Sequence, residues 1–358
     1  MKSALIWAYT QVNLGDDLFI KILTERYPEH TFSILGSKSK LIPFTSIANL
    51  NIYNTEISKV DSLLKRVGIN IGLYDRRVKK LAQKHDLTIN IGGSIFIEDN
   101  NWERTLHLYD NVIKSSNSFV IIGSNFGPFH TNSYRSKYFE AFRRVNDVCF
   151  RDYASFDLFK ELQIVRQAPD IVFNLNAEKV GTYRDKDYIL ISVMNLASKD
   201  SLKQYRDTYE SNIINICHEL INMGQKVKLM SFCESEGDEL AIENIRSKIA
   251  NPLLSAYYYK GDMDEALTVV KSSKSVVATR FHSMILAFVF KKPVFPIIYS
   301  EKSLNVLNDI DFSGNFSHVS EKINIYTLMK QLNSVELNLI TLQGNNQFDY
   351  LDKVLGEC

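Results

Sequence analysis

The combination of side chains best suited to chemistry in this sequence is Arg280-Phe281-His282. It follows a short apolar segment, 275–278, that predicts a strand, and it opens a largely apolar stretch, 281–290, that predicts a buried helix. An arginine and a histidine at a helix N-terminus add two donors to backbone N–H groups that already favour an anion. The triplet predicts an anion site with a titratable group beside it. The structural alternative is an arginine paired with a carboxylate and a histidine bound by backbone.

Other polar and glycine-containing segments also follow predicted strands, where ligands of open parallel sheets bind. They are Asn13-Leu14-Gly15-Asp16-Asp17, Gly92-Gly93-Ser94, Gly123-Ser124-Asn125, Arg151-Asp152 and Asn195. Arg151 is a candidate second cation that would meet Arg280 across a cleft, and His130 lies in a loop that could line it. Turn formation, helix capping by Asp16 or Asp17, and a surface ion pair of Arg151 are the structural alternatives. The glycines complete no dinucleotide fingerprint and there is no Walker lysine motif, so nicotinamide and ATP are disfavoured.

The composition describes a chain with no global affinity for polyanions. Of 358 residues, 45% are hydrophobic and 23% are charged, which is ordinary for a folded protein. With 42 basic against 41 acidic residues the net charge is +1, so we expect no nucleic-acid partner. The four cysteines form no CxxC pair, which predicts neither a zinc site nor a disulfide framework and suits a reducing compartment. We expect no transmembrane or targeting segment and a cytoplasmic protein, with peripheral contact at the inner face of the membrane left open.

Short apolar strands alternate with amphipathic helices along most of the chain. This rhythm predicts an α/β fold of two Rossmann-like domains with parallel sheets, facing each other across a cleft. The predicted strands are 4–9, 31–35, 87–91, 119–122 and 148–150, then 188–193, 227–230, 256–259, 275–278 and 294–298. The domain bounds are 1–175 and 182–335, with a polar linker near 174–186 and a C-terminal tail at 336–358. The segment 37–80 shows only weak periodicity.

Taken in order, these segments resemble the polysaccharide pyruvyl transferase family. The resemblance rests on short motifs spread from residue 5 to about residue 310. They are Asn13-Leu14-Gly15-Asp16, Gly92-Gly93, Gly123-Ser124-Asn125-Phe126-Gly127-Pro128, Arg151-Asp152-Tyr153-Ala154-Ser155, Ala168-Pro169-Asp170, Thr279-Arg280-Phe281-His282-Ser283, Ala287, Lys292-Pro293-Val294 and the segment 299–302. The sequence departs from the family pattern at Ser94, where a third glycine is frequent.

The resemblance implies a fold similar to GT-B glycosyltransferases, with the acceptor on the first domain and the donor on the second. It also implies that the pyruvyl group of phosphoenolpyruvate moves onto two hydroxyls of a sugar, as a cyclic ketal, with release of phosphate. The acceptor would be a bacterial-type surface polysaccharide or its lipid-linked precursor. No cofactor and no metal are expected.

The residues can be given roles in that chemistry. Phosphoenolpyruvate carries a phosphate and a carboxylate, for which Arg280 and Arg151 are the candidate cations, with Ser283 beside them and Lys302 for the departing phosphate. His282 would protonate the methylene carbon, and Asp16 or Asp152 would accept hydroxyl protons. On the acceptor side the candidates are Asn13, Gly15, Ser94, Asn125 and His130.

Two alternatives stay open at the level of sequence. One is a glycosyltransferase of the same architecture that uses a sugar nucleotide, with Glu234, Glu236 or Asp238 reading the ribose. The other is a non-catalytic sugar-binding assembly protein, which would not need the arrangement of Arg280 and His282.

Overall fold

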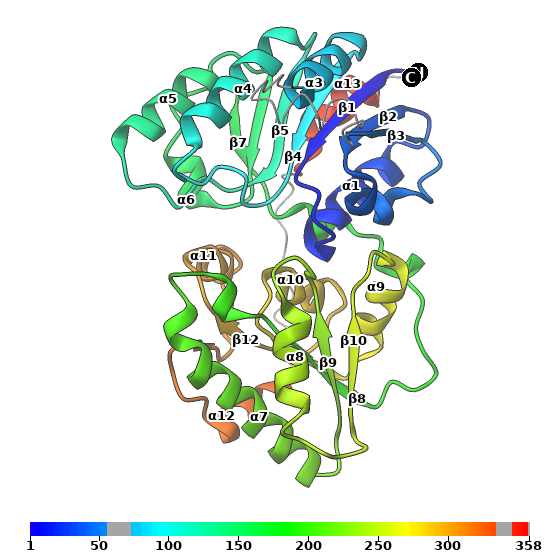
Figure 1. Ribbon diagram of the computed structural model, residues 1–358, viewed down its shortest axis with the longest axis vertical. Helices are drawn as coiled ribbons and strands as arrows, with labels where there is room; N and C mark the ends of the chain where they lie inside the picture. Colours follow the sequence, from blue (N-terminus) through cyan, green and yellow to red (C-terminus); the bar gives the residue numbers. More distant parts are fainter. Residues whose placement is uncertain (56–72, 334–345, 357–358) are drawn as a thin grey trace, which may run out of the picture. The chain divides into compact units, whose positions relative to one another are not determined.

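The computed structural model describes residues 1–55, 73–333 and 346–356, and these form two compact units, each built on a parallel sheet (Figure 1). Among the described residues, the first unit comprises 1–10, 19–171 and 346–356, and the second comprises 11–18 and 172–333. Helix α1 therefore contributes its first turn to the second unit and the rest of its length to the first. The fold-class prediction of two parallel α/β domains is confirmed.

The first sheet has seven parallel strands in the order β3-β2-β1-β4-β5-β6-β7. Helices α3, α4 and α5 pack on one face of this sheet around a core rich in aromatic side chains. The bounds are β1 Ser3–Ala8, α1 Leu14–Arg26, β2 Thr31–Gly36, η1 Lys38–Phe44, β3 Leu50–Asn54, α3 Leu73–Lys84, β4 Leu87–Ile91, α4 Trp102–Ser115, β5 Phe119–Ser124, α5 Asn132–Phe142, β6 Asp147–Phe150, α6 Tyr153–Asp157, β7 Val165–Gln167 and α13 Asp349–Leu355.

The second sheet has six parallel strands in the order β10-β9-β8-β11-β12-β13. Helices α7, α8 and α12 share one hydrophobic core with this sheet. The bounds are η2 Ile171–Asn174, η3 Ala177–Lys179, β8 Tyr188–Ser192, η4 Leu196–Ser198, η5 Lys203–Tyr205, α7 Arg206–Asn222, β9 Lys226–Ser231, α8 Asp238–Arg246, β10 Leu254–Tyr258, α9 Met263–Ser272, β11 Ser275–Ala278, α10 Phe281–Val289, β12 Val294–Ile298, α11 Glu301–Asp309, β13 Ser317–His318 and α12 Ile325–Leu332.

In each sheet the strand order changes sense beside the first strand of the unit. This topological switch point lies between β1 and β4 in the first unit and between β8 and β11 in the second. Crossovers on the two sides of such a point lie on opposite faces, so the loops after these strands separate and leave room for a ligand. The sheet topology therefore predicts ligand-binding residues after Ala8 and Ile91 in the first unit, and after Ser192 and Ala278 in the second.

The structure differs from the sequence-based elements in several places. Strand β3 lies in the segment that showed weak periodicity, because an edge strand whose last four residues are exposed carries little hydrophobic pattern. The short strands β7 and β13 were also missed. The sequence predicts a helix over about 153–162, but α6 ends at Asp157. Helix α1 begins at Leu14, so Asp16 and Asp17 lie in its first turn and do not cap it.

The C-terminal helix α13 belongs to the first unit. Its Asp352 carboxylate accepts two hydrogen bonds from the Arg26 guanidinium, at 2.9 and 2.7 Å. Just before the helix, the buried Gln347 side chain accepts from the Gly123 N–H at 2.8 Å and donates to the Ala168 carbonyl at 2.7 Å. One side-chain amide thus binds backbone groups within β5 and just after β7, the two strands that flank β6.

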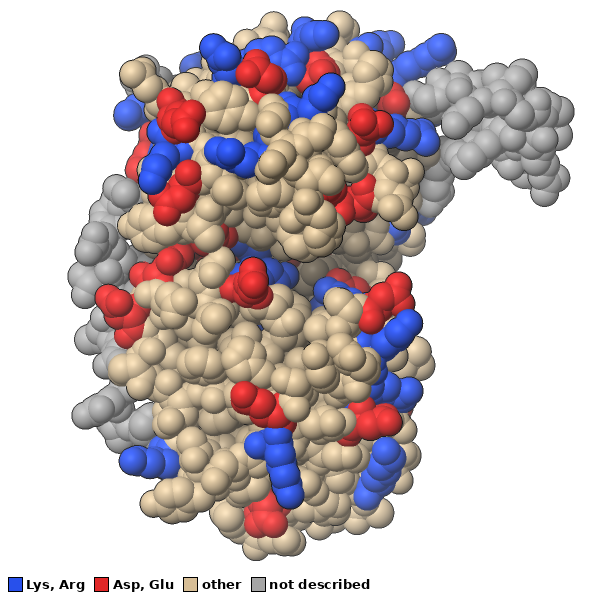
Figure 2. Space-filling model, turned by 90° about the vertical axis from the view of Figure 1, so that its left-hand side faces the viewer, with Lys and Arg blue, Asp and Glu red and all other residues tan. Residues whose placement is uncertain are grey.

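Charged side chains of both signs are intermingled on the face drawn in Figure 2, in keeping with the net charge of +1. Within the described ranges, no helix combines the length and apolar character needed to cross a membrane.

Candidate active site

The strongest cluster of functional side chains lies at the switch point of the second sheet. Arg280 directly precedes helix α10, and the N–H groups of Thr279 and Arg280 both donate to the Ser192 hydroxyl at the end of β8, at 2.9 and 3.1 Å. The Ser283 hydroxyl donates to the Arg280 carbonyl at 2.6 Å. These contacts fix the turn from β11 into α10 and with it the direction of the Arg280 side chain.

The guanidinium of Arg280 is buried and ion-paired to two carboxylates. Its Nε donates to Asp238 Oδ2 at 2.9 Å, its Nη2 bonds Asp238 Oδ1, and its Nη1 donates to Glu236 Oε2 at 2.6 Å. Burial opposes the charge, but Asp238 and Glu236 outweigh it and raise the pKa of Arg280. Arg280 is therefore a fixed cation at the N-terminus of α10.

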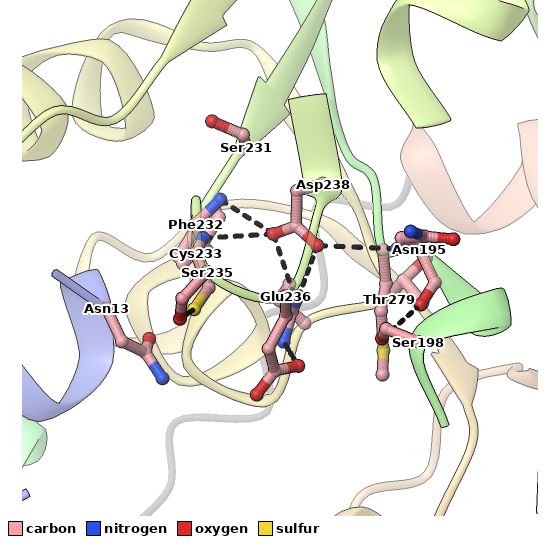
Figure 3. A network of polar contacts seen from close by, with 12 residues as sticks. Asn13, Asn195, Ser198, Ser231, Phe232, Cys233, Ser235, Glu236, Asp238 and Thr279 are labelled. Carbon is pink, nitrogen blue, oxygen red and sulfur yellow. Dashed lines mark hydrogen bonds and ion pairs between the residues drawn. The ribbon is translucent and has the colours of Figure 1, made fainter. Parts of the chain in front are cut away.

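Asp238 is the centre of the network shown in Figure 3. Its side chain is fully buried and accepts from the N–H groups of Phe232 and Cys233, both at 3.0 Å, and of Asn195, at 3.3 Å. Gly237 precedes it with φ +78°, a conformation that favours glycine, and the turn it makes carries Asp238 into the first position of α8. Asp238 thus joins the loops after β8, β9 and β11 into one unit.

Glu236 is the second carboxylate on Arg280 and is more exposed. Its side chain is 28% exposed, and its Oε2 also lies 3.4 Å from Lys199 Nζ, in the loop after β8. Burial would raise the pKa of Glu236, but the charges of Arg280 and Lys199 outweigh burial and lower it to about 2. Glu236 is therefore ionised throughout the physiological range.

His282 lies against the first turn of α1. A Cβ atom on Gly15 would stand 1.7 Å from His282 Nδ1 and 2.4 Å from its Cγ. The ring and the backbone can approach this closely only because residue 15 has no side chain. The first turn of α1 is itself held to the loop after β9, since the Leu14 N–H donates to the Phe232 carbonyl at 3.0 Å and Asn13 forms a bridge with Cys233.

Two acidic residues of that turn have different surroundings. The Asp16 carboxylate accepts from the Asn13 amide at 2.9 Å. Asp17 is fully buried and accepts from the Tyr259 hydroxyl at 2.7 Å. Burial raises the pKa of Asp17 well above its ordinary value. The hydrogen bond from Tyr259 opposes this shift, and the charge of Asp16 adds a smaller contribution to it.

Two other predicted donor-side residues, Lys302 and Ser283, lie around the start of α10. Lys302 Nζ stands 5.6 Å from the centre of the Phe281 ring and 5.5 Å from that of Tyr299. Lys199 Nζ is 5.7 Å from the centre of the same Tyr299 ring, so two ammonium groups share one aromatic side chain. Ser283 is buried within the turn and shares a hydrogen bond of 2.7 Å with Ser192, which gives its hydroxyl a structural role.

In the first unit the predicted residues gather at the ends of β4, β5 and β6. The Arg151 guanidinium is buried, and donates to Asp170 Oδ2 at 2.9 Å and to Asn125 Oδ1 at 2.6 Å. The Ser94 hydroxyl donates to the same Asn125 oxygen at 3.0 Å. A Cβ atom on Gly93 would stand 2.9 Å from Arg151 Nη1, so the Gly92-Gly93 turn lies directly on this guanidinium.

His130 and Asp152 lie apart from that cluster. His130 is exposed, and its backbone N–H bonds the carboxylate of Glu98. Asp152 is buried as the N-cap of α6 and accepts from the Ser155 N–H at 2.7 Å, which accounts for its carboxylate by capping.

The structure thus groups Asn13, Gly15 and Asp16 with Arg280 and His282 in the second unit, and Ser94 and Asn125 with Arg151 in the first. That Arg151 and Arg280 share one cleft stays a prediction. No sequence pattern indicated Lys199, whose position depends on the loop after β8. A motif did contain Asp170, but only the fold shows it paired with Arg151. In the described ranges, His, Cys, Asp and Glu nowhere gather in a group of three suited to a metal ion.

Comparison with solved structures defines the class of the fold. UDP-GlcNAc 2-epimerase from Methanocaldococcus jannaschii matches with a TM-score of 0.62 at 13% identity, covering 99% of both chains. ADP-heptose LPS heptosyltransferase II from E. coli gives 0.52 at 11% identity, over 94% of this chain and 98% of that one. MurG from Acinetobacter baumannii gives 0.50 at 12% identity, over 100% of both. The fold is that of GT-B glycosyltransferases and related epimerases.

The sequence itself identifies the family. Residues 13–301 match the polysaccharide pyruvyl transferase family, and the chain belongs to it. The match runs from the Asn13 motif, through the Arg151 and Arg280 segments, to the start of α11. Membership makes the protein a transferase that modifies polysaccharides. No curated protein matched the sequence.

Proposed function

We propose that this protein transfers the pyruvyl group of phosphoenolpyruvate to two hydroxyls of one sugar residue, in a polysaccharide or its lipid-linked precursor. The observation that carries the proposal is the placement of His282. The imidazole is seated against Gly15, two residues after a fixed arginine, at the switch point where a ligand would bind. Family membership supplies the reaction class, and this geometry supplies a positioned proton donor beside cationic groups.

The proposed reaction needs one proton at carbon before any hydroxyl can attack. His282 donates it to the methylene carbon, which leaves the adjacent carbon electrophilic. The first sugar hydroxyl adds there and loses its proton, phosphate then leaves with its bridging oxygen, and the second hydroxyl closes the ketal. Of the two hydroxyl protons released, one restores His282 and the other leaves on phosphate. Lys302, near Phe281 and Tyr299, is the candidate cation for the leaving group.

The sugar-nucleotide alternative loses its candidate ribose ligands. Asp238 and Glu236 are ion-paired to Arg280, and Glu234 lies 2.8 Å from Lys260 Nζ. Asp238 is fully buried and offers no surface to a ribose, and Glu236 lies between two cations that would attract an anionic donor. The geometry therefore favours an anionic donor held by cations over a ribose held by a carboxylate.

A donor panel tests the proposal directly. Wild-type protein and a sugar acceptor are supplied with phosphoenolpyruvate or with sugar nucleotides, and release of phosphate or nucleotide is followed. We expect phosphate from phosphoenolpyruvate only, and nucleotide release would refute the proposal. In heavy water the ketal methyl group should gain one deuterium. His282→Gln should lower kcat by about 10²–10⁴-fold while donor binding changes by less than about tenfold. A product without deuterium, or near-normal turnover by this variant, would remove His282 from its role.

A further inference from the structure

The two carboxylates on Arg280 are held in different ways. A guanidinium can grip an oxyanion through either of two edges, each with a pair of parallel N–H groups. Asp238 takes the edge made by Nε and Nη2, while Glu236 bonds Nη1, on the remaining edge. Asp238 has no exposed side-chain surface and is also bound by three backbone N–H groups, whereas the Glu236 side chain is 28% exposed.

Glu236 has the surroundings that a substrate carboxylate would need. One of its oxygens lies 2.6 Å from Arg280 Nη1 and 3.4 Å from Lys199 Nζ, so a planar guanidinium and an ammonium group converge on it. The Lys199 side chain is 35% exposed, which leaves this group within reach of a ligand. Arginine is well suited to bind carboxylates, and an edge occupied by Glu236 cannot at the same time bind a donor.

We propose that Glu236 occupies the carboxylate position of the donor site and is exchanged for the donor's own carboxylate on binding. This inference rests on the proposed function, since it assigns a place to one group of phosphoenolpyruvate. In the exchange Asp238 keeps Arg280 charged and oriented, while Glu236 leaves its ion pairs and Lys199 passes to the ligand. Glu236 thus sets the affinity for the donor by competing with it.

The charges of the cluster favour exchange over simple addition. With Glu236 in place, its carboxylate and that of Asp238 balance the cations Arg280 and Lys199. A further carboxylate would meet a site that is already neutral, whereas a site without Glu236 has one uncompensated positive charge. Because Glu236 is ionised at physiological pH, protonation does not relieve the competition, and the two anions must trade places.

Substitutions on the two sides of the ion pair should act in opposite directions. Glu236→Gln removes the competing charge, and we expect the dissociation constant for phosphoenolpyruvate to fall by about fivefold, the effect of losing an ion pair worth roughly 1 kcal/mol. Lys199→Met removes a cation from the ligand, and the same constant should rise by about tenfold. A purely structural pair would not give opposite signs. Glu234→Gln, two residues earlier on the same loop, is the matched control and should change binding by less than about twofold.

The measurement is calorimetric titration of the full-length variants with phosphoenolpyruvate, pyruvate and inorganic phosphate. Tighter binding of both carboxylates by Glu236→Gln, with phosphate little changed, supports the exchange. Weaker or unchanged binding of phosphoenolpyruvate overturns it, as does an equal gain for phosphate, which would indicate a general charge effect. The proposal is also overturned if none of the variants binds phosphoenolpyruvate. If binding follows the expected pattern but phosphate is never released to a sugar acceptor, the proposed function fails and the exchange stands.

Discussion

Replacing Gly15 with alanine should disable His282 without removing it. The new Cβ would stand 1.7 Å from His282 Nδ1, whereas ordinary contact begins at 3.4 Å, so the ring must retreat by about 1.7 Å. A misplacement of about 1 Å in a reacting group costs on the order of 10²-fold in rate. We therefore expect kcat to fall by at least about 10²-fold, while donor affinity, which depends on other groups, changes much less.

Phosphate release from phosphoenolpyruvate gives kcat and KM for this variant, and thermal unfolding checks that it is folded. Gly181→Ala is the control for glycine substitution, because its added Cβ meets only Thr268 Oγ1, at the ordinary contact distance of 3.4 Å. If the effect of residue 15 passes through the imidazole, Gly15→Ala should cost little more in a His282→Ala background. Near-normal turnover by Gly15→Ala, or an equal loss in both backgrounds, would refute the reasoning.

Two further predictions concern stability. Burial raises the pKa of Asp17 in the folded state, so the stability that this carboxyl contributes is fully present below its unfolded pKa, near 3.8, and is lost as pH rises through its folded pKa. Asp17→Asn should therefore unfold at a higher denaturant concentration than wild type near pH 7 but not near pH 3. An equal shift at both pH values would contradict this reasoning. Gln347→Ala leaves the Gly123 N–H and the Ala168 carbonyl without their side-chain partner, and should lower the free energy of unfolding by at least about 2 kcal/mol in urea titrations, with a change under about 0.5 kcal/mol counting against the role of the C-terminal segment.

Much of the fold follows from patterns that are local in the sequence. Apolar runs such as 119–122 and 188–193, each followed by a turn and a helix, predict parallel strands because a strand buried on both faces reads as continuous hydrophobic residues. The confirmed fold class rests on that pattern. The sequence pattern fails at β3, an edge strand with little buried surface, and at α6, which ends at Asp157.

The candidate site divides in the same way. Arg280 and His282 can be placed at a helix N-terminus from sequence, because both lie within four residues of the end of one predicted strand. The carboxylates that face Arg280 could not be predicted from the sequence. Asp238 and Glu236 lie more than forty positions away, and only the order of β8, β9 and β11 in the sheet brings them to Arg280.

The contact of the site that joins the residues farthest apart in the sequence could not be predicted from the sequence. The neighbours of Gly15 in the sequence suggest a turn glycine. The reason that no side chain fits there is the imidazole of His282, in helix α10 and far away in the sequence. Local sequence determines which backbone conformations are favourable, so it positions strands, helices and the residues at their ends. The close approach of two segments depends on how whole elements pack, and only the tertiary structure decides it.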